Sequence, residues 1–180
     1  GSVGVEQLQG PVGIVHLGLG AFHRTHQAVY TDAAIAASGG DWRIIGVSLR
    51  STAAADQLNP QQGRYTVLER AAHGTTARVI GALEKVLVGS RDGLEILEAM
   101  VAAQTRIVSL SVTEKAYGID RKTFAAEPNH PAVCADLKTP QSPAGVLGFI
   151  TEALRQRRAN GTVPFTVLCC DNLPENGALL

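Results

Sequence analysis

The stretch Val12-Gly-Ile-Val-His-Leu-Gly18-Leu-Gly20-Ala-Phe-His-Arg24 decides the fold. A short apolar run ends in Gly-x-Gly and opens directly into a helical pattern, which is the strand–turn–helix context of a phosphate-binding turn. Gly18 permits the tight turn, and Gly20 lets backbone N–H groups approach a pyrophosphate, which the helix N-terminus also attracts. His23 stands where a third glycine is expected, so helix–strand packing differs there. An ordinary strand-to-helix loop is the alternative, because such loops often carry glycine.

The composition sets the class of protein. The 180 residues are enough for one domain with a sizeable core. The 16 basic and 16 acidic side chains balance, so neither nucleic acid nor an anionic membrane is an expected partner. Three cysteines do not make a disulfide framework, and the sequence shows no signal peptide and no bilayer-spanning run. We therefore expect a reduced, cytoplasmic protein.

Periodicity predicts alternating strands and helices. Short β-branched runs predict strands, and longer Ala/Leu-rich stretches predict helices. The predicted strands are 12–17, 42–49, 106–112 and 165–170, and the predicted helices are 24–37, 92–103 and 142–159. Alternation in 64–70 and 76–83 predicts an antiparallel hairpin inserted at the sheet edge, and 118–140 reads as a long surface loop. The fold class is α/β, with a Rossmann-like, doubly wound and mostly parallel sheet.

Three unusual segments follow predicted strands: 18–24, 113–118 and 171–177. Ligands bind outside the carboxyl ends of parallel strands, so these segments predict one site. Thr113, Glu114 and Lys115 directly follow a buried strand and would line its cleft. A Glu–Lys pair on a solvated loop is the alternative, and Lys115 as a general base is a further reading, because desolvation lowers a lysine pKa.

Asn172 is the candidate for contact with a reacting oxygen. Its amide N–H can donate to a substrate oxygen that gains negative charge during a reaction. Asparagine also favours turns and helix caps, so a structural Asp-Asn turn is an equal alternative from chemistry alone.

A metal site finds little support in the sequence. His23-x-x-His26 together with the run 169–171 could supply zinc ligands. Because no second Cys/His pair at ligand spacing exists, we expect no metal.

The segment after the second strand bears on the choice of cofactor. An acidic residue about 20 residues past the glycine turn usually accepts the ribose hydroxyls. Here residues 47–52 read Val-Ser-Leu-Arg-Ser-Thr, and the first carboxylate is Asp56. Arg50 could instead hold a 2′-phosphate, or it could be a plain surface residue. The residues leave NAD and NADP open.

Taken together, the segments 18–30, 107–117 and 170–177 resemble the polyol-specific long-chain dehydrogenase/reductase family, which includes mannitol 2-dehydrogenase and fructuronate reductase (D-mannonate oxidoreductase). The resemblance covers the chain from about residue 10. It implies an NAD-dependent oxidoreductase, with NADP possible, that interconverts a secondary alcohol of a polyol or sugar acid and its ketone. It also implies that Asn172 helps to hold the reacting oxygen.

The resemblance further implies how the work is divided along the chain. Family members are much longer, and their catalytic lysine lies in a helical second domain to which nothing here corresponds, so Lys115 is not the base. Residues 10–180 are then a truncated dinucleotide-binding domain, inactive alone. The pyrophosphate turn would be formed by Gly18, Leu19, Gly20, Ala21, Phe22 and His23.

Two other functions remain as alternatives. One is a non-catalytic nucleotide-binding module, and the other is an S-adenosylmethionine-dependent methyltransferase, which shares a glycine-rich first turn. The sequence names neither the particular polyol or sugar acid nor the oligomeric state.

Overall fold

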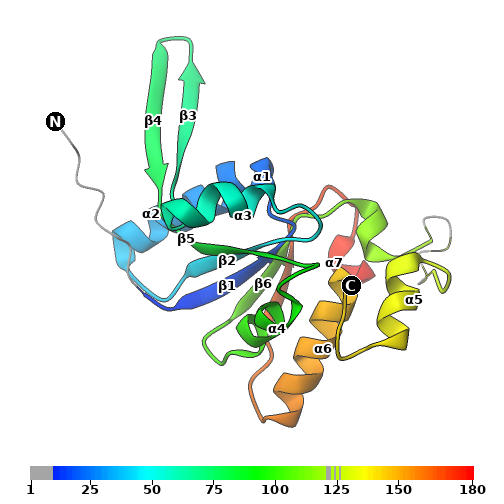
Figure 1. Ribbon diagram of the computed structural model, residues 1–180. Coiled ribbons are helices and arrows are strands. Elements are labelled where there is room, and N and C mark those ends of the chain that lie inside the picture. Colours follow the sequence, from blue (N-terminus) through cyan, green and yellow to red (C-terminus); the bar gives the residue numbers. More distant parts are fainter. Residues whose placement is uncertain (1–9, 121–122, 124, 126) are drawn as a thin grey trace.

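The computed structural model describes residues 10–120, 123, 125 and 127–180 and shows a parallel sheet between two layers of helices (Figure 1). The strand order is β5-β2-β1-β6-β7, and all four pairings are parallel. The strands are β1 (Val12–Leu17), β2 (Arg43–Ser48), β5 (Leu83–Val88), β6 (Ile107–Leu110) and β7 (Thr166–Cys169). The predicted Rossmann-like class is confirmed, and β1 has the predicted bounds.

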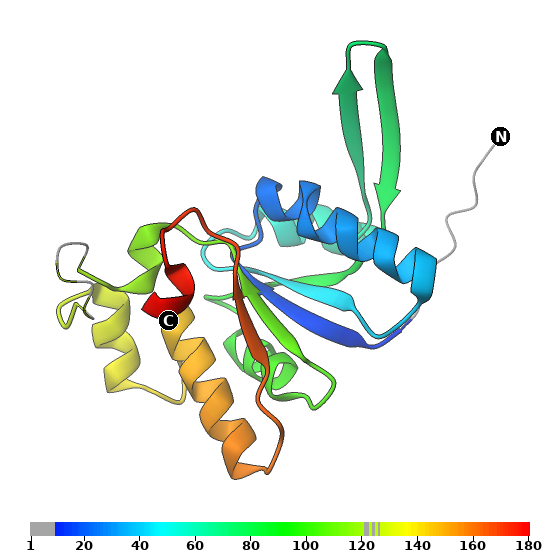
Figure 2. The same ribbon diagram turned by 180° about the vertical axis from the view of Figure 1, so that it is seen from behind.

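Helices cover the two faces of the sheet separately (Figures 1 and 2). One face carries α1 (Ala21–Thr25), α2 (Gln27–Ser38) and α3 (Ala53–Leu58), and the other carries α4 (Gly93–Val101) and α6 (Val146–Ala159). Because side chains alternate along a strand, each strand feeds both layers. Ile14 and Ile44 pack with the α2 layer, whereas Val15 and Ile45 pack with α4 and α6.

Several predicted elements need correction. The predicted helix 24–37 begins at Ala21 and is broken at His26, whose backbone (φ −122°, ψ −90°) is not helical. The predicted helix 142–159 begins only at Val146, because the Asp136 carboxylate binds the amides of Ala144 and Gly145 and holds the preceding turn.

Three shorter elements also differ from the prediction or were missed by it. Residues 83–88 form β5 instead of ending the hairpin, and α3 follows β2 without a predicted counterpart. The predicted loop 118–140 contains α5 (Pro131–Lys138), which starts with proline at a position that suits a helix N-terminus. The remaining short helices are η1 (Asn59–Gln61), η2 (Glu114–Tyr117) and α7 (Asn176–Leu179).

The predicted hairpin exists, but it does not join the sheet. Strands β3 (Tyr65–Ala71) and β4 (Gly74–Ile80) pair only with each other and project from the body (Figure 1). At its base, Asp32 on α2 pairs with Arg78 at 3.0 Å and accepts the Gly81 N–H at 2.7 Å. The hairpin is thus anchored to a helix, and β5 is left as the sheet edge.

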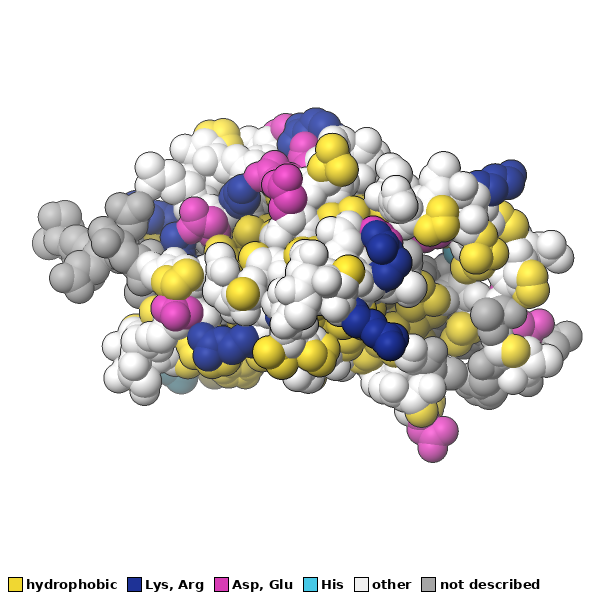
Figure 3. Space-filling model, turned by 90° about the horizontal axis from the view of Figure 1, so that it is seen from below, with side chains coloured by type: hydrophobic (Ala, Val, Ile, Leu, Met, Phe, Trp, Pro, Cys, Tyr) yellow, Lys and Arg dark blue, Asp and Glu magenta, His cyan; other side chains and the backbone are white. Residues whose placement is uncertain are grey.

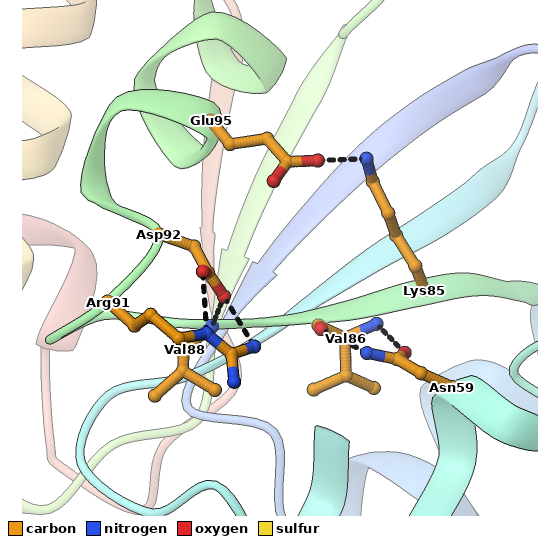
Figure 4. Close-up of polar contacts among 7 residues, drawn as sticks. All are labelled: Asn59, Lys85, Val86, Val88, Arg91, Asp92 and Glu95. Carbon is orange, nitrogen blue, oxygen red and sulfur yellow. Dashed lines mark hydrogen bonds and ion pairs between the residues drawn. The ribbon is translucent and has the colours of Figure 1, made fainter. Parts of the chain in front are cut away.

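The Asn59 side chain pairs with the exposed edge of β5. Its Nδ2 donates to the Val86 carbonyl at 2.9 Å, and its Oδ1 accepts the Val86 N–H at 2.8 Å (Figure 4). The amide therefore satisfies two backbone groups that an edge strand otherwise leaves open. At the end of β5, Asp92 accepts the Val88 N–H at 2.8 Å and pairs with Arg91.

Asn59→Ala is expected to lower the free energy of unfolding by about 2 kcal/mol, because both Val86 backbone groups lose their partner. Urea unfolding measures the loss. Gln61→Ala is the matched control, since Gln61 is exposed and its side chain donates to the Gln57 carbonyl four residues earlier, away from β5. Equal effects of the two substitutions would contradict the role of Asn59 at the strand edge.

The surface carries charges of both signs. Figure 3 shows Lys and Arg interspersed with Asp and Glu on the face seen from below, with apolar side chains between them. Within the described residues, no helix combines the length and the apolarity that crossing a membrane requires. The three cysteines have free thiols.

Candidate functional site

The glycine turn follows β1 and is fixed to the strands on both sides of it. The N–H groups of Gly18 and Leu19 both donate to the Val47 carbonyl on β2 at 2.9 Å. Gly18 has φ +92°, and a Cβ there would lie 2.4 Å from the Ser111 carbonyl oxygen next to β6. Only glycine fits this position, in terms of both its backbone conformation and the space available.

The next glycine faces open space. Gly20 is the N-cap of α1, and a Cβ added there would meet nothing closer than the Gly18 oxygen at 3.9 Å. No side chain in the described part of the chain caps this helix end, so the amides of its first turn are free to bind an anion. Ala21 and Phe22 are exposed beside it. These residues fit a pyrophosphate.

The Leu19 side chain takes no part in that surface. It is buried, and its methyl groups lie against Gly46 of β2, where a Cβ would come within 2.8 Å. Of the predicted turn residues, Leu19 can therefore contribute only its backbone. Arg24 folds back toward the turn, with Nε 3.3 Å from the Gly20 carbonyl.

A buried polar network lies beneath the turn. His16, in the middle of β1, contacts Ser109 Oγ with Nδ1 at 2.8 Å and Ser111 Oγ with Nε2 at 2.9 Å. The Ser111 hydroxyl reaches the Gly18 carbonyl at 3.1 Å, and the Ser109 hydroxyl reaches Gln27 Oε1 at 2.9 Å. The network therefore ties the turn to β6 and α2. Burial, followed by the neighbouring His23, lowers the pKa of His16 well below its usual value.

His23 is stacked on His16. The ring centroids are 3.6 Å apart, and the His23 side chain is 1% exposed. Neither ring nitrogen has a partner in hydrogen-bond geometry within the described chain. Burial lowers its pKa to about 4, while the nearby Gln27 side chain acts in the opposite direction. The residue at the third-glycine position thus packs beneath the turn as a neutral ring.

Asp171 joins the loops that follow β6 and β7. One carboxylate oxygen accepts the Val112 N–H at 2.6 Å, and the other accepts the Tyr117 hydroxyl. Tyr117 is buried, and burial together with the Asp171 hydrogen bond raises its pKa, so it stays a donor. The sequence indicated Asp171 as a possible metal ligand or as part of an Asp-Asn turn, and neither interpretation predicted this bridge between two loops.

This bridge brings three predicted site residues together. Thr113, Lys115 and Asn172 are exposed and line one cavity of about 550 Å³ at the carboxyl ends of β6 and β7. Glu114 begins η2, but its side chain lies outside what the structure describes. The exposed Asn172 amide can therefore hydrogen-bond a ligand in the cavity. An asparagine that stabilises a turn would instead use its amide in hydrogen bonds to the backbone.

Arg50 lies on the other side of the glycine turn. It is exposed in the loop after β2, and the Ser48 hydroxyl holds that loop by donating to the Ser51 carbonyl at 2.6 Å. In the sheet, β2 lies on one side of β1, and β6 and β7 lie on the other. Arg50 follows β2 and Asn172 follows β7, so the two residues lie on opposite sides of the glycine turn.

The possible zinc ligands do not assemble. His23 is buried, whereas His26 is exposed and stacks on Phe22 with centroids 4.3 Å apart. The described residues contain no group of three or more His, Cys, Asp or Glu side chains placed to hold a metal ion.

The strand order and the glycine turn define a Rossmann-type domain, in which the turn lies where the strand order reverses, between β1 and β6. Sheets of this class bind their ligands at that point. The sequence model of the family described as "Mannitol dehydrogenase Rossmann domain" matches residues 12–180, and the chain belongs to that family.

Individual proteins with similar sequences are oxidoreductases by name. D-mannonate oxidoreductase of Escherichia coli (strain K12) is 45% identical over 168 residues, which cover 91% of this chain and 35% of the relative. Polyol:NADP oxidoreductase of Gluconobacter oxydans (strain 621H) is 42% identical over 170 residues, 92% of this chain and 35% of the relative.

A solved structure of Pseudomonas fluorescens mannitol 2-dehydrogenase, a ternary complex with NAD and D-mannitol, matches with a TM-score of 0.88 and 42% identity. The match covers 95% of this chain and 36% of that one. The chain thus spans little more than a third of the length of these proteins.

Proposed function

We propose that this chain is the cofactor-binding domain, residues 10–180, of an NAD- or NADP-dependent dehydrogenase. The whole protein would interconvert a secondary alcohol of a polyol or sugar acid, of the mannitol/fructose or mannonate/fructuronate type, and its ketone. The observation that carries the proposal is the turn at Gly18 and Gly20. At Gly18 the neighbouring backbone leaves no room for a side chain, and at Gly20 the lack of a side chain leaves the N-terminus of α1 accessible. Membership of the family and the relatives' names support the substrate class.

The residues divide the work by position. The backbone from Gly18 to His23, with Leu19, Gly20, Ala21 and Phe22 between them, would hold the pyrophosphate. Thr113, Glu114 and Lys115 would line the cleft. Asn172 would donate to the substrate oxygen, which gains negative charge when the alcohol loses its hydroxyl proton or, in the reverse direction, when the ketone carbon accepts hydride. A nicotinamide cofactor supplies the hydride chemistry. Proton transfer would fall to the rest of the protein, so this chain alone is expected to bind without turnover.

The residues that would bind the adenosine ribose of the cofactor decide between NAD and NADP. No carboxylate follows β2 before Asp56, and the exposed Arg50 is free to meet a 2′-phosphate. We propose that NADP is accepted beside NAD, in line with the polyol:NADP relative. A cytoplasmic location is proposed from the free thiols.

Parallel calorimetric titrations with NADH, NADPH and S-adenosylmethionine test the cofactor. Saturable binding of NADH, NADPH or both, with none of S-adenosylmethionine, is the expected result. Binding of S-adenosylmethionine alone would favour a methyltransferase. A folded sample that binds none of the three would contradict the cofactor site. Turnover of the whole protein with polyols then separates a dehydrogenase from a non-catalytic module.

Asn172→Ala in the whole protein is expected to lower kcat about 100-fold, with a smaller change in KM, because the donor acts on charge that develops during the reaction. Steady-state kinetics measures both constants. Asn160→Ala is the control, since Asn160 is an exposed asparagine at the opposite end of the sheet. Unchanged kcat in Asn172→Ala would leave Asn172 as a turn residue.

A further inference from the structure

The cavity at the carboxyl ends of β6 and β7 contains two charged side chains, Lys115 and Asp171, and the protein uses them differently. We propose that Lys115 binds a substrate carboxylate in this cavity, so that the substrate of the whole protein is a sugar acid and not a neutral polyol. The inference rests on the proposed function and decides between the two substrate types that the proposed function leaves open.

Asp171 is used by the protein itself. Its two carboxylate oxygens accept the Val112 N–H at 2.6 Å and the Tyr117 hydroxyl. Its backbone carbonyl accepts the side-chain amide of Asn176 at 3.0 Å. Each carboxylate oxygen thus has a protein donor, which fixes Asp171 in the wall of the cavity and offsets part of its negative charge.

The polar groups that remain for a ligand are rich in donors. An ammonium such as that of Lys115 has three donors and no acceptor, and the Asn172 amide adds two donors. Both side chains are exposed, and Lys115 forms no ion pair with any residue that the structure describes. A hydroxyl is both donor and acceptor, whereas a carboxylate only accepts and carries the charge opposite to that of Lys115. The cavity therefore suits a ligand that ends in a carboxylate.

The backbone holds Lys115 and Asn172 in one frame. Lys115 lies in η2, which ends at the buried Tyr117. The Tyr117 hydroxyl donates to Asp171, the residue directly before Asn172. A cavity of about 550 Å³ has room for a six-carbon chain. One substrate can thus be held at two points, with its reacting oxygen at Asn172 and its carboxylate at Lys115.

A carboxylate keeps its charge throughout the reaction. A carboxyl group has a pKa of about 4, so it is ionised at neutral pH in both the alcohol and the ketone. Lys115 would therefore bind substrate and product alike, and such uniform binding lowers KM more than it changes kcat. Asn172 acts on charge that develops during the reaction, so the two residues should differ in their kinetic effects.

Lys115→Met in the whole protein is expected to raise KM for mannonate about 20-fold, with a smaller change in kcat, because a charge-assisted hydrogen bond is lost. Lys115→Arg keeps the charge and should restore most of the affinity. Lys138→Met is the control, since Lys138 is an exposed lysine on α5 that lies outside this cavity. Steady-state kinetics with hexonates, including mannonate, and with hexitols, including mannitol, measures the preference.

Mannonamide tests the charge directly, because it keeps the carbons and hydroxyls of mannonate and lacks the negative charge. In the unmodified protein, its KM should lie about 20-fold above that of mannonate. In Lys115→Met the two KM values should be similar.

Three results would overturn the inference while the proposed function stands. The first is a higher kcat/KM for hexitols than for hexonates, and the second is an unchanged KM for mannonate in Lys115→Met. The third is a calorimetric loss of NADH affinity in Lys115→Met as large as the rise in KM, which would assign Lys115 to the cofactor. A folded whole protein that oxidises neither class of compound would overturn the proposed dehydrogenase itself, and this inference with it.

Discussion

Gly18→Ala is expected to destabilise the fold by about 3 kcal/mol and to lower Tm by roughly 10 °C. Two costs combine in this substitution. Alanine at φ +92° is strained, and its Cβ would lie 2.4 Å from the Ser111 carbonyl oxygen. Backbone atoms form that contact, so a side-chain rotation cannot relieve it. Thermal denaturation followed by circular dichroism measures the loss, and cofactor affinity should fall with it, because the turn must move away from β6.

Gly20→Ala separates stability from binding. Its φ is −123°, which alanine adopts freely, and the space around its Cβ is open. We expect Tm to stay within about 2 °C of the unmodified protein. NADH affinity should fall, because the methyl group occupies the space through which the pyrophosphate approaches the amides. If Gly20→Ala bound NADH as well as the unmodified protein, or if Gly18→Ala kept its Tm, the division of roles between the two glycines would be wrong.

The elements that were predicted correctly are those whose own sequence pattern reflects how they are buried in the fold. Strand β1 is buried on both faces, so its sequence is an apolar run and its bounds follow directly. Strand β5 is also mostly buried, but the alternating pattern of β4 runs into it, and the two-residue break at 81–82 carries no strong turn signal. Helix α3 is shorter than two turns and shows no periodicity of its own.

The site was predicted as a set of segments rather than as a set of contacts. The topology of a parallel sheet placed Thr113, Lys115 and Asn172 together, and the structure brings them into one cavity. The contacts of His16 with Ser109 and Ser111 join residues 93 and 95 positions apart, and no pattern in one sequence encodes that pairing. A histidine inside an apolar strand was the available signal, because a buried polar side chain requires a partner.

Acidification is expected to destabilise this protein through the two stacked histidines. Both are neutral in the folded state, because burial holds their pKa values below those of the unfolded chain, where histidine titrates near 6.5. Above that pH neither state is protonated, and the pair has no effect. Below that pH the unfolded chain gains protons before the folded protein does, so the free energy of unfolding decreases as the pH is lowered. For His23, with a folded pKa of about 4, the loss ends near pH 4 and amounts to about 3 kcal/mol.

Urea unfolding at pH 7.5 and pH 4.5 of the unmodified protein and of His23→Phe isolates this contribution. Phenylalanine keeps a ring that can stack on His16 and cannot be protonated, so His23→Phe should lose about 2 kcal/mol less on acidification. His73→Gln removes an imidazole from the exposed hairpin tip and controls for the loss of a histidine as such. Identical losses in the unmodified protein and His23→Phe would mean that His23 is not held neutral.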